Sequence, residues 1–301
     1  MNRKTLLLFA AMLLTAIASW ADSSAGIILS HAGKATPYKA SDLKTALLTA
    51  EEGDTLFLSA GQYAGFTLNK AITVRGVGYE TKITGTVEIR LPNNLTLTEG
   101  VPLLEGLNVM NGSSLLVSAP CTNFLVRFCR FDNFTCNING MNNAMIDRCE
   151  IGTFNISEYM TDFYVRNTYI DNLSSTNTAY HNQCNFINCD IYNVSTGSGH
   201  FNDCVFFSGT IYSSLLCRCL TMNNAGVHSS SACDKVEHTT STTWVNKEAF
   251  VDGVRIGYLA GNTPFVSDYR PYGPKEDSKN SSVVVDDGKK TIDATIYMEP
   301  N

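Results

Sequence analysis

Apolar and polar positions along the middle of this chain follow a pattern that returns about every 20 residues. Its clearest units are 124–133, 144–151, 163–172 and 184–193, and each has two short apolar runs around a polar turn. Equivalent positions form apolar columns, of which two are Val126, Ile146, Val165 and Phe186, and Phe131, Ile151, Ile170 and Ile191. Because so short a unit cannot bury its own apolar face, the pattern predicts a solenoid of stacked units.

Runs of this length predict β-strands, each paired in parallel with the same strand of the next unit at about 4.8 Å. The crossover rule for parallel strands makes the winding right-handed. Leucine-rich repeats have a similar period but require regular Leu and Asn positions that this chain lacks, and a left-handed β-helix requires a hexapeptide repeat. The predicted fold is all-β, a right-handed parallel β-helix.

A short helix is predicted before the first strands, with Ser41 as its N-cap and Gly53 beyond its end. Its apolar face would contain Leu43, Ala46, Leu47 and Ala50. Such a helix would cover the unpaired edge of the first coil. We therefore predict an N-terminal cap.

The C-terminal part of the chain differs in composition from the repeats. It becomes rich in Ser and Thr after residue 236 and ends in a hairpin pattern, with apolar runs at 282–285 and 291–297. We predict a β-helix with its N-terminal cap at 22–236 and a C-terminal β-rich cap at 237–301.

Residues 1–21 have the pattern of a secretory signal peptide. Arg3 and Lys4 precede an apolar run at 6–17, and Ser19-Trp20-Ala21 forms a small-residue cleavage site. The alternative, a membrane span, needs a longer apolar run. We expect an exported protein, periplasmic, cell-surface or extracellular, with no transmembrane segment in the mature chain.

Composition excludes some classes of protein. The chain has 301 residues, a net charge of −6, 44% hydrophobic residues and 17% charged residues. This balance is typical of a globular chain rather than a disordered one. Binding to nucleic acid is not expected, because the chain has no basic stripe to neutralise phosphates.

Ten cysteines in an exported chain suggest disulfides, but their spacing favours another interpretation. Most of them recur in one column with a threonine among them: Cys129, Cys149, Thr168, Cys189, Cys204 and Cys219. In a stacked interior, cysteine behaves as a small hydrophobe. We predict buried free thiols, with disulfides as the alternative. A metal site is not expected, because the chain has no C-x-x-C pair.

Two sequence segments resemble a known family. Residues 53–63 read Gly-Asp-Thr-Leu-Phe-Leu-Ser-Ala-Gly-Gln-Tyr, and residues 72–78 read Ile-Thr-Val-Arg-Gly-Val-Gly. They resemble the first coils of the right-handed parallel β-helix superfamily, the pectin-lyase-like proteins, over about residues 40–235. The tail is similar to the ends of secreted β-helix proteins of Bacteroidota-type bacteria. The resemblance implies the fold and raises the question of polysaccharide cleavage.

Two charged columns flank the cysteine column. One contains Arg127, Asp147 and Arg166, and the other contains Arg130, Glu150, Tyr169 and Asp190. One interpretation is a site for acidic sugars, with Arg127 or Arg166 as base or carboxylate clamp. Asp147, Glu150 and Asp190 would then be acids or Ca²⁺ ligands. The favoured interpretation is ion pairing between coils on a solvated face.

The catalytic motifs of the resembled family are largely missing. Of the polygalacturonase-type pattern only Gly199-His200 is present, followed by Phe201, and the pectate-lyase-type pattern is absent. His200 is predicted to be a turn or core residue, and so is His181. A ladder of side-chain hydrogen bonds is predicted for Asn133, Asn172 and Asn193, which share one column.

Aromatic residues give the candidate binding site. Tyr164, Tyr169 and Tyr192 could form a stacking platform for sugars, although such rings also pack without any ligand. We therefore predict a non-catalytic protein that binds carbohydrate or a surface partner along an elongated face and needs no cofactor. The alternatives are a polysaccharide lyase or hydrolase, the only case in which Ca²⁺ is expected, and a purely structural envelope or adhesin-like protein.

Overall fold

The computed structural model describes residues 26–136, 140–156, 160–175, 184–194, 199–212, 214–228, 231–239 and 249–260, and the strands at 275–276, 282–286, 291–295 and 298–299. The predicted signal peptide and His181 lie outside the described residues. Residues 270–301 form a second compact unit with two antiparallel pairs. These pairs are β28 (Ser282–Asp286) with β29 (Thr291–Thr295), and β27 (Lys275–Glu276) with β30 (Met298–Glu299). The first pair lies where the sequence predicts a hairpin.

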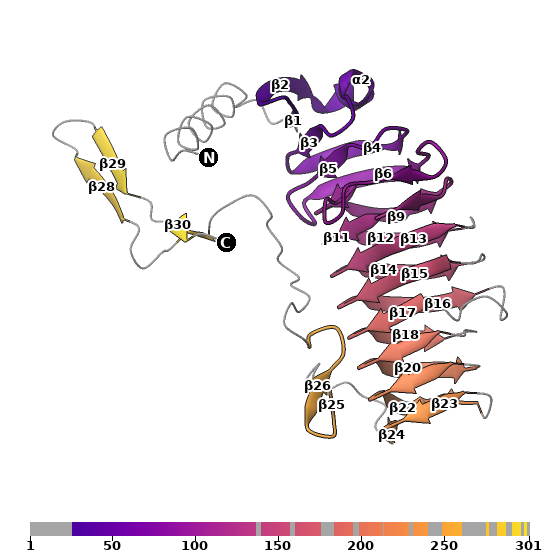
Figure 1. Ribbon diagram of the computed structural model, residues 1–301. Coiled ribbons are helices and arrows are strands. Elements are labelled where there is room, and N and C mark those ends of the chain that lie inside the picture. The colour runs from indigo at the N-terminus through magenta and orange to yellow at the C-terminus, as the bar shows by residue number, and fades with distance from the viewer. Residues whose placement is uncertain are drawn as a thin grey trace. The chain divides into compact units, whose positions relative to one another are not determined.

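Apart from its first two strands, which pair antiparallel, and a hairpin at 249–256, the described part of the first unit is a parallel β-solenoid, as predicted (Figure 1). Its coils contribute strands to two long sheets, which we call sheet A and sheet B. The main path of sheet A contains β2 (Lys34–Lys39), β1 (Gly26–His31), β3 (Thr55–Leu58), β5 (Thr73–Arg75), β8 (Leu104–Glu105), β11 (Leu125–Arg127), β13 (Met141–Asp147), β15 (Met160–Arg166), β17 (Cys184–Ile187), β19 (His200–Asn202), β21 (Leu215–Cys217) and β23 (Ala232–Asp234), with β7 (Leu95–Thr96) and β10 (Cys121–Thr122) beside it. Sheet B contains β4 (Gly61–Leu68), β6 (Thr81–Ile89), β9 (Asn108–Val117), β12 (Arg130–Cys136), β14 (Glu150–Ile156), β16 (Tyr169–Ser175), β18 (Asp190–Val194), β20 (Val205–Ile211), β22 (Leu220–Val227) and β24 (Glu237–His238).

Both apolar columns predicted from the repeat are stacked in register. Val126 pairs with Ile146, which pairs with Val165, which pairs with Phe186 in sheet A. The column that begins at Phe131 is stacked in the same way in sheet B. All of these side chains are buried. The core between the sheets therefore consists of ladders of equivalent residues.

Sheet A turns into sheet B at a tight corner with one residue in the left-handed conformation. This residue has φ between 48° and 57° at Phe128, Arg148, Asn167, Asn188, Asp203 and Arg218. The cysteine column comes directly after it. The Cys149 thiol donates to the Asp147 carbonyl at 3.4 Å, and the Thr168 hydroxyl donates to the Arg166 carbonyl at 2.7 Å. Thr168 fits the column because this position requires a small side chain with a hydrogen-bond donor.

All ten cysteines are free thiols, and every member of the cysteine column is buried. The prediction of buried free thiols is therefore confirmed for this column. The asparagine ladder is present for two of its three members, since the Asn193 amide donates to Asn172 Oδ1 at 3.2 Å. Asn133 instead pairs in register with Thr153. A further step of this kind joins Asn143 to Asn123 at 2.7 Å.

The N-terminal helix α2 (Leu43–Thr49) follows a 3-10 turn, η1 (Ala40–Asp42). Its N-cap is Asp42 rather than the predicted Ser41, because the 3-10 turn occupies the position of the first expected turn. Leu43 and Ala46 are buried, so the predicted apolar face does face the core. At the other end, the Lys70 ammonium donates to the carbonyls of Leu48 and Ala50 at 2.9 and 2.6 Å.

A short hairpin follows the last described coil. It contains β25 (Ala249–Val251) and β26 (Val254–Ile256), which are antiparallel. Its buried residues pack against the outer face of sheet B, in a small cluster that contains Ala249, Val251, Ile256 and Val205. This hairpin places the chain against the side of the solenoid.

Candidate binding face

The outer face of sheet A has two columns of side chains. Successive side chains of a strand point to opposite faces, so the neighbours of the buried Val126 column point outward. The first outer column contains Leu125, Met145, Tyr164, Asn185, His200, Leu215 and Ala232. The second outer column contains Arg75, Glu105, Arg127, Asp147, Arg166, Ile187, Asn202, Cys217 and Asp234.

The upstream half of the second outer column is an ion ladder, which we define as Arg75, Glu105, Arg127, Asp147 and Arg166. Glu105 is 2% exposed, and its two carboxylate oxygens each lie 2.9 Å from a guanidinium Nε, of Arg75 and of Arg127. Asp147 is also buried and lies 2.7 Å from Arg148 Nη2 and 3.9 Å from Arg166 Nε. Glu105 is therefore paired between coils, whereas Asp147 is paired mainly with its chain neighbour Arg148 and more loosely with Arg166 of the next coil.

A third outer column begins sheet B, on the other side of the corner. Arg130 Nη2 lies 2.8 Å from Glu150 Oε1, and the Tyr79 hydroxyl donates to Glu150 Oε2 at 3.4 Å. The Arg130 guanidinium lies 5.6 Å from the centre of the Tyr79 ring, within reach of a cation–π contact. Burial, and next the charge of Glu150, raise the pKa of Tyr79 above its usual value.

Tyr169 and Asp190 continue this third column. Burial is the main cause that raises the pKa of Tyr169 to about 12 and the pKa of Asp190 to about 7. Asp190 Oδ1 accepts a hydrogen bond from the Tyr258 backbone amide at 3.1 Å. The Tyr169 and Tyr258 rings meet edge to face at 6.0 Å. Asp190 is therefore covered by a distant segment of the chain.

The catalytic candidates are divided between the two sheets. Arg127, Asp147 and Arg166 lie in the ion ladder of sheet A, whereas Glu150 and Asp190 lie in sheet B. Arg127 and Asp190 are three coils apart, about 14 Å along the solenoid. Among the residues that the structure describes, no group of three or more His, Cys, Asp or Glu side chains could hold a metal ion. The structure therefore divides the five candidates into a group of three in the ion ladder and a pair in sheet B.

The three candidate tyrosines also lie on different faces. Tyr164 is in the first outer column of sheet A, and Tyr169 starts a strand of sheet B. Tyr192 is further along sheet B, where it is 52% exposed and stacks on Phe207 at 6.0 Å. One ligand lying flat on a sheet could contact Tyr164 or the sheet B pair, but not all three.

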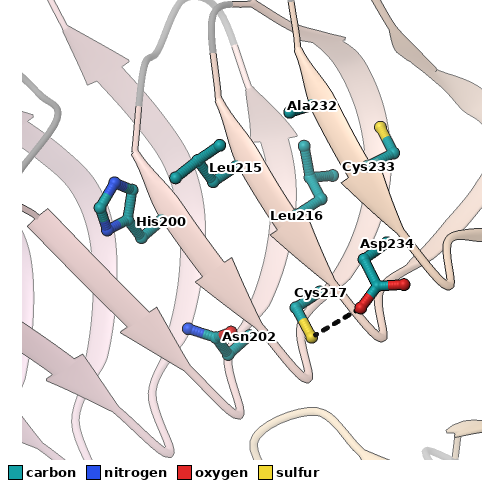
Figure 2. Close-up of a pocket in the computed structure, with 8 residues that line it drawn as sticks. All are labelled: His200, Asn202, Leu215, Leu216, Cys217, Ala232, Cys233 and Asp234. Carbon is teal, nitrogen blue, oxygen red and sulfur yellow. Dashed lines mark hydrogen bonds between the residues drawn. The ribbon is translucent and has the colours of Figure 1, made fainter.

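A hollow of about 340 Å³ opens on sheet A near the end of the solenoid, and we call it the terminal hollow (Figure 2). Three neighbouring strands, β19, β21 and β23, carry its walls. It is lined by His200, Asn202, Leu215, Leu216, Cys217, Ala232, Cys233 and Asp234. The terminal hollow thus occupies the downstream end of the same outer columns that hold the ion ladder and Tyr164.

Its polar side chains have hydrogen-bonding capacity to spare. Within the described part of the chain, the side chains of His200 and Asn202 make no hydrogen bond or ion pair. The Cys217 thiol donates weakly to Asp234 Oδ2 at 3.9 Å (Figure 2). Leu215, which is 51% exposed, supplies an apolar wall. Such a mixture can take a ligand that has both hydroxyl groups and an apolar face.

Sequence reasoning missed the terminal hollow, although a signal was present. His200 is predicted as a turn or core residue, but it lies in the first outer column. It stands four residues before Cys204, just as Tyr164 stands four residues before Thr168. Counting back from the cysteine column would have placed it on the same face as Tyr164.

No protein-family model matches this chain, and neither a curated protein nor a solved structure is significantly similar to it. Among its described residues, no helix is long and apolar enough to cross a membrane.

Proposed function

We propose that this protein is a non-catalytic β-solenoid that binds carbohydrate along the outer face of sheet A, with the terminal hollow as the principal contact. One observation carries the proposal. His200 and Asn202 line an open hollow with side chains that use none of their hydrogen-bonding capacity within the described chain. In the ion ladder, by contrast, Glu105 is paired with two arginines of the neighbouring coils and Asp147 with Arg148 and Arg166.

The chemistry of the terminal hollow suits a hydroxyl-rich ligand. An Asn amide both donates and accepts hydrogen bonds, a neutral imidazole does the same, and a carboxylate such as Asp234 accepts them. Leu215 offers apolar surface to the C–H face of a sugar ring. Tyr164 adds a ring on the same face, four strands upstream of β23, which is roughly 19 Å at the usual strand spacing. An extended oligosaccharide can therefore contact both ends of this face.

The sign of the charges favours a neutral sugar. Asp234 contributes a carboxylate to the terminal hollow, so a uronic acid placed there would meet a like charge. The cation of this face nearest to it in the second outer column is Arg166, which is already paired with Asp147. A neutral polysaccharide is therefore the preferred ligand, and a surface glycan of another cell or of the same envelope would serve as partner.

The ion ladder supports a non-catalytic role. An arginine that acts as a base must have a guanidinium within hydrogen-bond reach of the substrate. Arg127 lies 2.9 Å from Glu105, and Arg166 lies 3.9 Å from Asp147. Each guanidinium thus faces a carboxylate of a neighbouring coil, an arrangement that suits structural pairing better than contact with a substrate.

Export to the cell envelope or beyond it completes the proposal and rests on the sequence. The signal-peptide pattern of residues 1–21 supports it. The resemblance of residues 53–63 and 72–78 to pectin-lyase-like proteins, and of the tail to Bacteroidota-type β-helix proteins, agrees with a polysaccharide ligand. Neither cofactor nor metal enters this role.

The test is a binding panel of neutral and acidic polysaccharides, followed by titration calorimetry with the tightest of them. Asn202→Ala and His200→Ala should each weaken binding about tenfold, the loss expected when one contact worth about 1.4 kcal/mol is removed. Tyr192→Ala is the matched control, because this exposed ring lies on sheet B, and it should leave the affinity unchanged.

Two results would contradict the proposal. The first is binding that is lost in Tyr192→Ala but kept in Asn202→Ala, which would move the site to sheet B. The second is cleavage of an acidic polymer, detected as new absorbance from unsaturated ends and abolished in Arg127→Ala or Arg166→Ala. That outcome would establish the lyase alternative.

A further inference from the structure

The segment 249–260, which we call the clasp, is fixed to the solenoid by contacts of different kinds. The Gly257 amide donates to the Asp203 carbonyl at 2.8 Å, and the Tyr258 amide donates to Asp190 Oδ1 at 3.1 Å. At the other end of the hairpin, Asp252 Oδ2 lies 2.9 Å from Lys235 Nζ, and both side chains are exposed. The clasp therefore touches several coils while belonging to none of them.

Under the clasp lies an apolar strip of sheet B. Ala249, Val251 and Ile256 of the clasp form a cluster with the buried Val205. Phe207 and Leu220 are half-buried beside this cluster. Removal of the clasp would expose this strip on the outer face of β20 and β22.

Asp190 is the polar group at the centre of this contact. It is 1% exposed, and its Oδ2 is buried without a hydrogen-bond partner in the described structure. Gly257 lies directly above it, since a Cβ at this glycine would come within 2.4 Å of Asp190 Oδ1. An ionised carboxylate in this position would be buried without a cation.

We propose that residues 249–260 form a proton-operated clasp, which stays closed on sheet B while Asp190 is protonated and opens as Asp190 ionises. The open state presents the apolar strip of β20 and β22 to solvent or to a partner. This role is independent of the carbohydrate face, because the clasp lies on sheet B and the terminal hollow lies on sheet A.

The groups that face Asp190 agree with this assignment. The register places Tyr169 of β16 on one side of it and Val205 of β20 on the other. Tyr258 faces it from the clasp, and burial raises the pKa of both tyrosines, so both phenols are neutral near neutral pH. The carboxylates Glu150 and Asp203 of neighbouring coils are paired with Arg130 at 2.8 Å and Arg218 at 2.6 Å, and Asp171 lies two residues from Tyr169. On the clasp, Asp252 is paired with Lys235, and Arg255 is exposed beside the buried Ile256. Within the described part of the chain, Asp190 makes no ion pair with any cation.

The direction of the pH effect follows from these surroundings. Burial raises the pKa of Asp190 to about 7 in the closed state, whereas an exposed aspartate titrates near 3.9. The closed state thus binds the proton more tightly than the open state. The free energy that favours closure is greatest below about pH 4. It falls by the same amount for each pH unit between about 4 and 7, and it is constant above about 7.

The test is hydrogen exchange of the Gly257 and Tyr258 amides in the full-length chain between pH 5 and 8, corrected for the intrinsic exchange rate. The opening constant should rise about tenfold per pH unit up to about pH 7 and then level off, the behaviour of a single proton. Amides of β14 should not share this dependence, because the solenoid stays folded when the clasp opens.

Two substitutions complete the test. Asp190→Asn keeps an acceptor for the Tyr258 amide and should remove the pH dependence, whereas Asp171→Asn on the neighbouring coil should retain it. Gly257→Ala should unprotect the clasp at every pH, because its methyl group meets Asp190. The proposal would be overturned if Asp190→Asn kept the pH dependence or if Gly257→Ala left the exchange of the clasp unchanged. It would also be overturned if the amides of β14 exchanged together with those of the clasp.

Discussion

Two regions of sheet A share one geometry and use it differently. In the ion ladder, from β5 to β15, Glu105 lies between the arginines of the two neighbouring coils, and Asp147 is paired closely with Arg148 of its own coil and more loosely with Arg166 of the next. In the terminal hollow, from β19 to β23, the same columns carry His200 and Asn202 with no partner in the described chain. The backbone register continues from one region into the other. Successive coils therefore share their backbone structure but differ in whether their outward side chains pair with one another.

The difference suggests how a repeat protein acquires a site. Ion pairs between stacked coils need only alternating signs in one column, and they close the surface to ligands. Where the charges in a column no longer alternate in sign, hydrogen-bond donors and acceptors stay available to a ligand. The ion ladder should therefore matter for stability and the terminal hollow for binding, and substitutions can separate the two.

The largest effect is expected for Glu105→Gln. Glu105 is almost fully buried and lies 2.9 Å from both Arg75 and Arg127. Loss of its charge leaves two guanidinium groups without their shared partner, which should lower the free energy of unfolding by about 3 kcal/mol. Denaturant unfolding followed by circular dichroism measures this. Asn202→Ala, in the same column, is the control and should change stability by less than about 0.5 kcal/mol.

Much of the fold could be predicted because stacking imposes periodicity on the sequence. The column of Val126, Ile146 and Val165 is visible in the sequence and is in register in the structure. The helix start was less accurate, since Ser41 and Asp42 are both good caps and the 3-10 turn that contains them leaves no sequence signal. The cysteine column was recognised as buried, but its hydrogen bonds follow from the corner geometry.

The sites were harder to predict, because contacts between distant segments leave no periodic trace. Tyr164, Tyr169 and Tyr192 all lie in the repeats, but their distances from the corner place Tyr164 on sheet A and the other two on sheet B. The cover on Asp190 comes from Tyr258, 68 residues later in the chain. Asp190 and Tyr258 do not belong to the same repeat, so the contact between them is visible only in the structure.

The corner offers a way to test whether the two regions share their scaffold. Cys149 lies beside the ion ladder and Cys204 beside the terminal hollow, and each thiol donates to the carbonyl two residues earlier, at 3.4 and 3.3 Å. Cys149→Ala and Cys204→Ala should each cost about 1–2 kcal/mol of unfolding free energy, from the small cavity and the lost donor. Denaturant unfolding of both variants measures it.

Threonine is the matched substitution at both corners, because Thr168 already fills this column. Cys149→Thr and Cys204→Thr should recover part of the lost stability. If the loss of unfolding free energy differs strongly between Cys149→Ala and Cys204→Ala, the two regions differ in their backbone as well as in their surface.

Substitutions in the terminal hollow should change carbohydrate affinity without changing stability. The double variant His200→Ala with Asn202→Ala should lose carbohydrate affinity by more than tenfold while its unfolding midpoint stays close to that of the native chain. Both side chains are only half-buried and have no internal partner in the described structure, so their removal leaves no buried group unsatisfied. Titration calorimetry and thermal unfolding on the same samples give both values.

The smallest effect is expected at the boundary between the regions. Arg166 ends the ion ladder, is 40% exposed and lies 3.9 Å from Asp147, which Arg148 holds more closely at 2.7 Å. Arg166→Ala should therefore cost only about 0.5 kcal/mol of unfolding free energy and leave carbohydrate affinity unchanged. Calorimetric titration and denaturant unfolding check both statements. A loss of affinity as large as that of Asn202→Ala would extend the binding face into the ion ladder, and the contrast between a closed and an open half of sheet A would no longer hold.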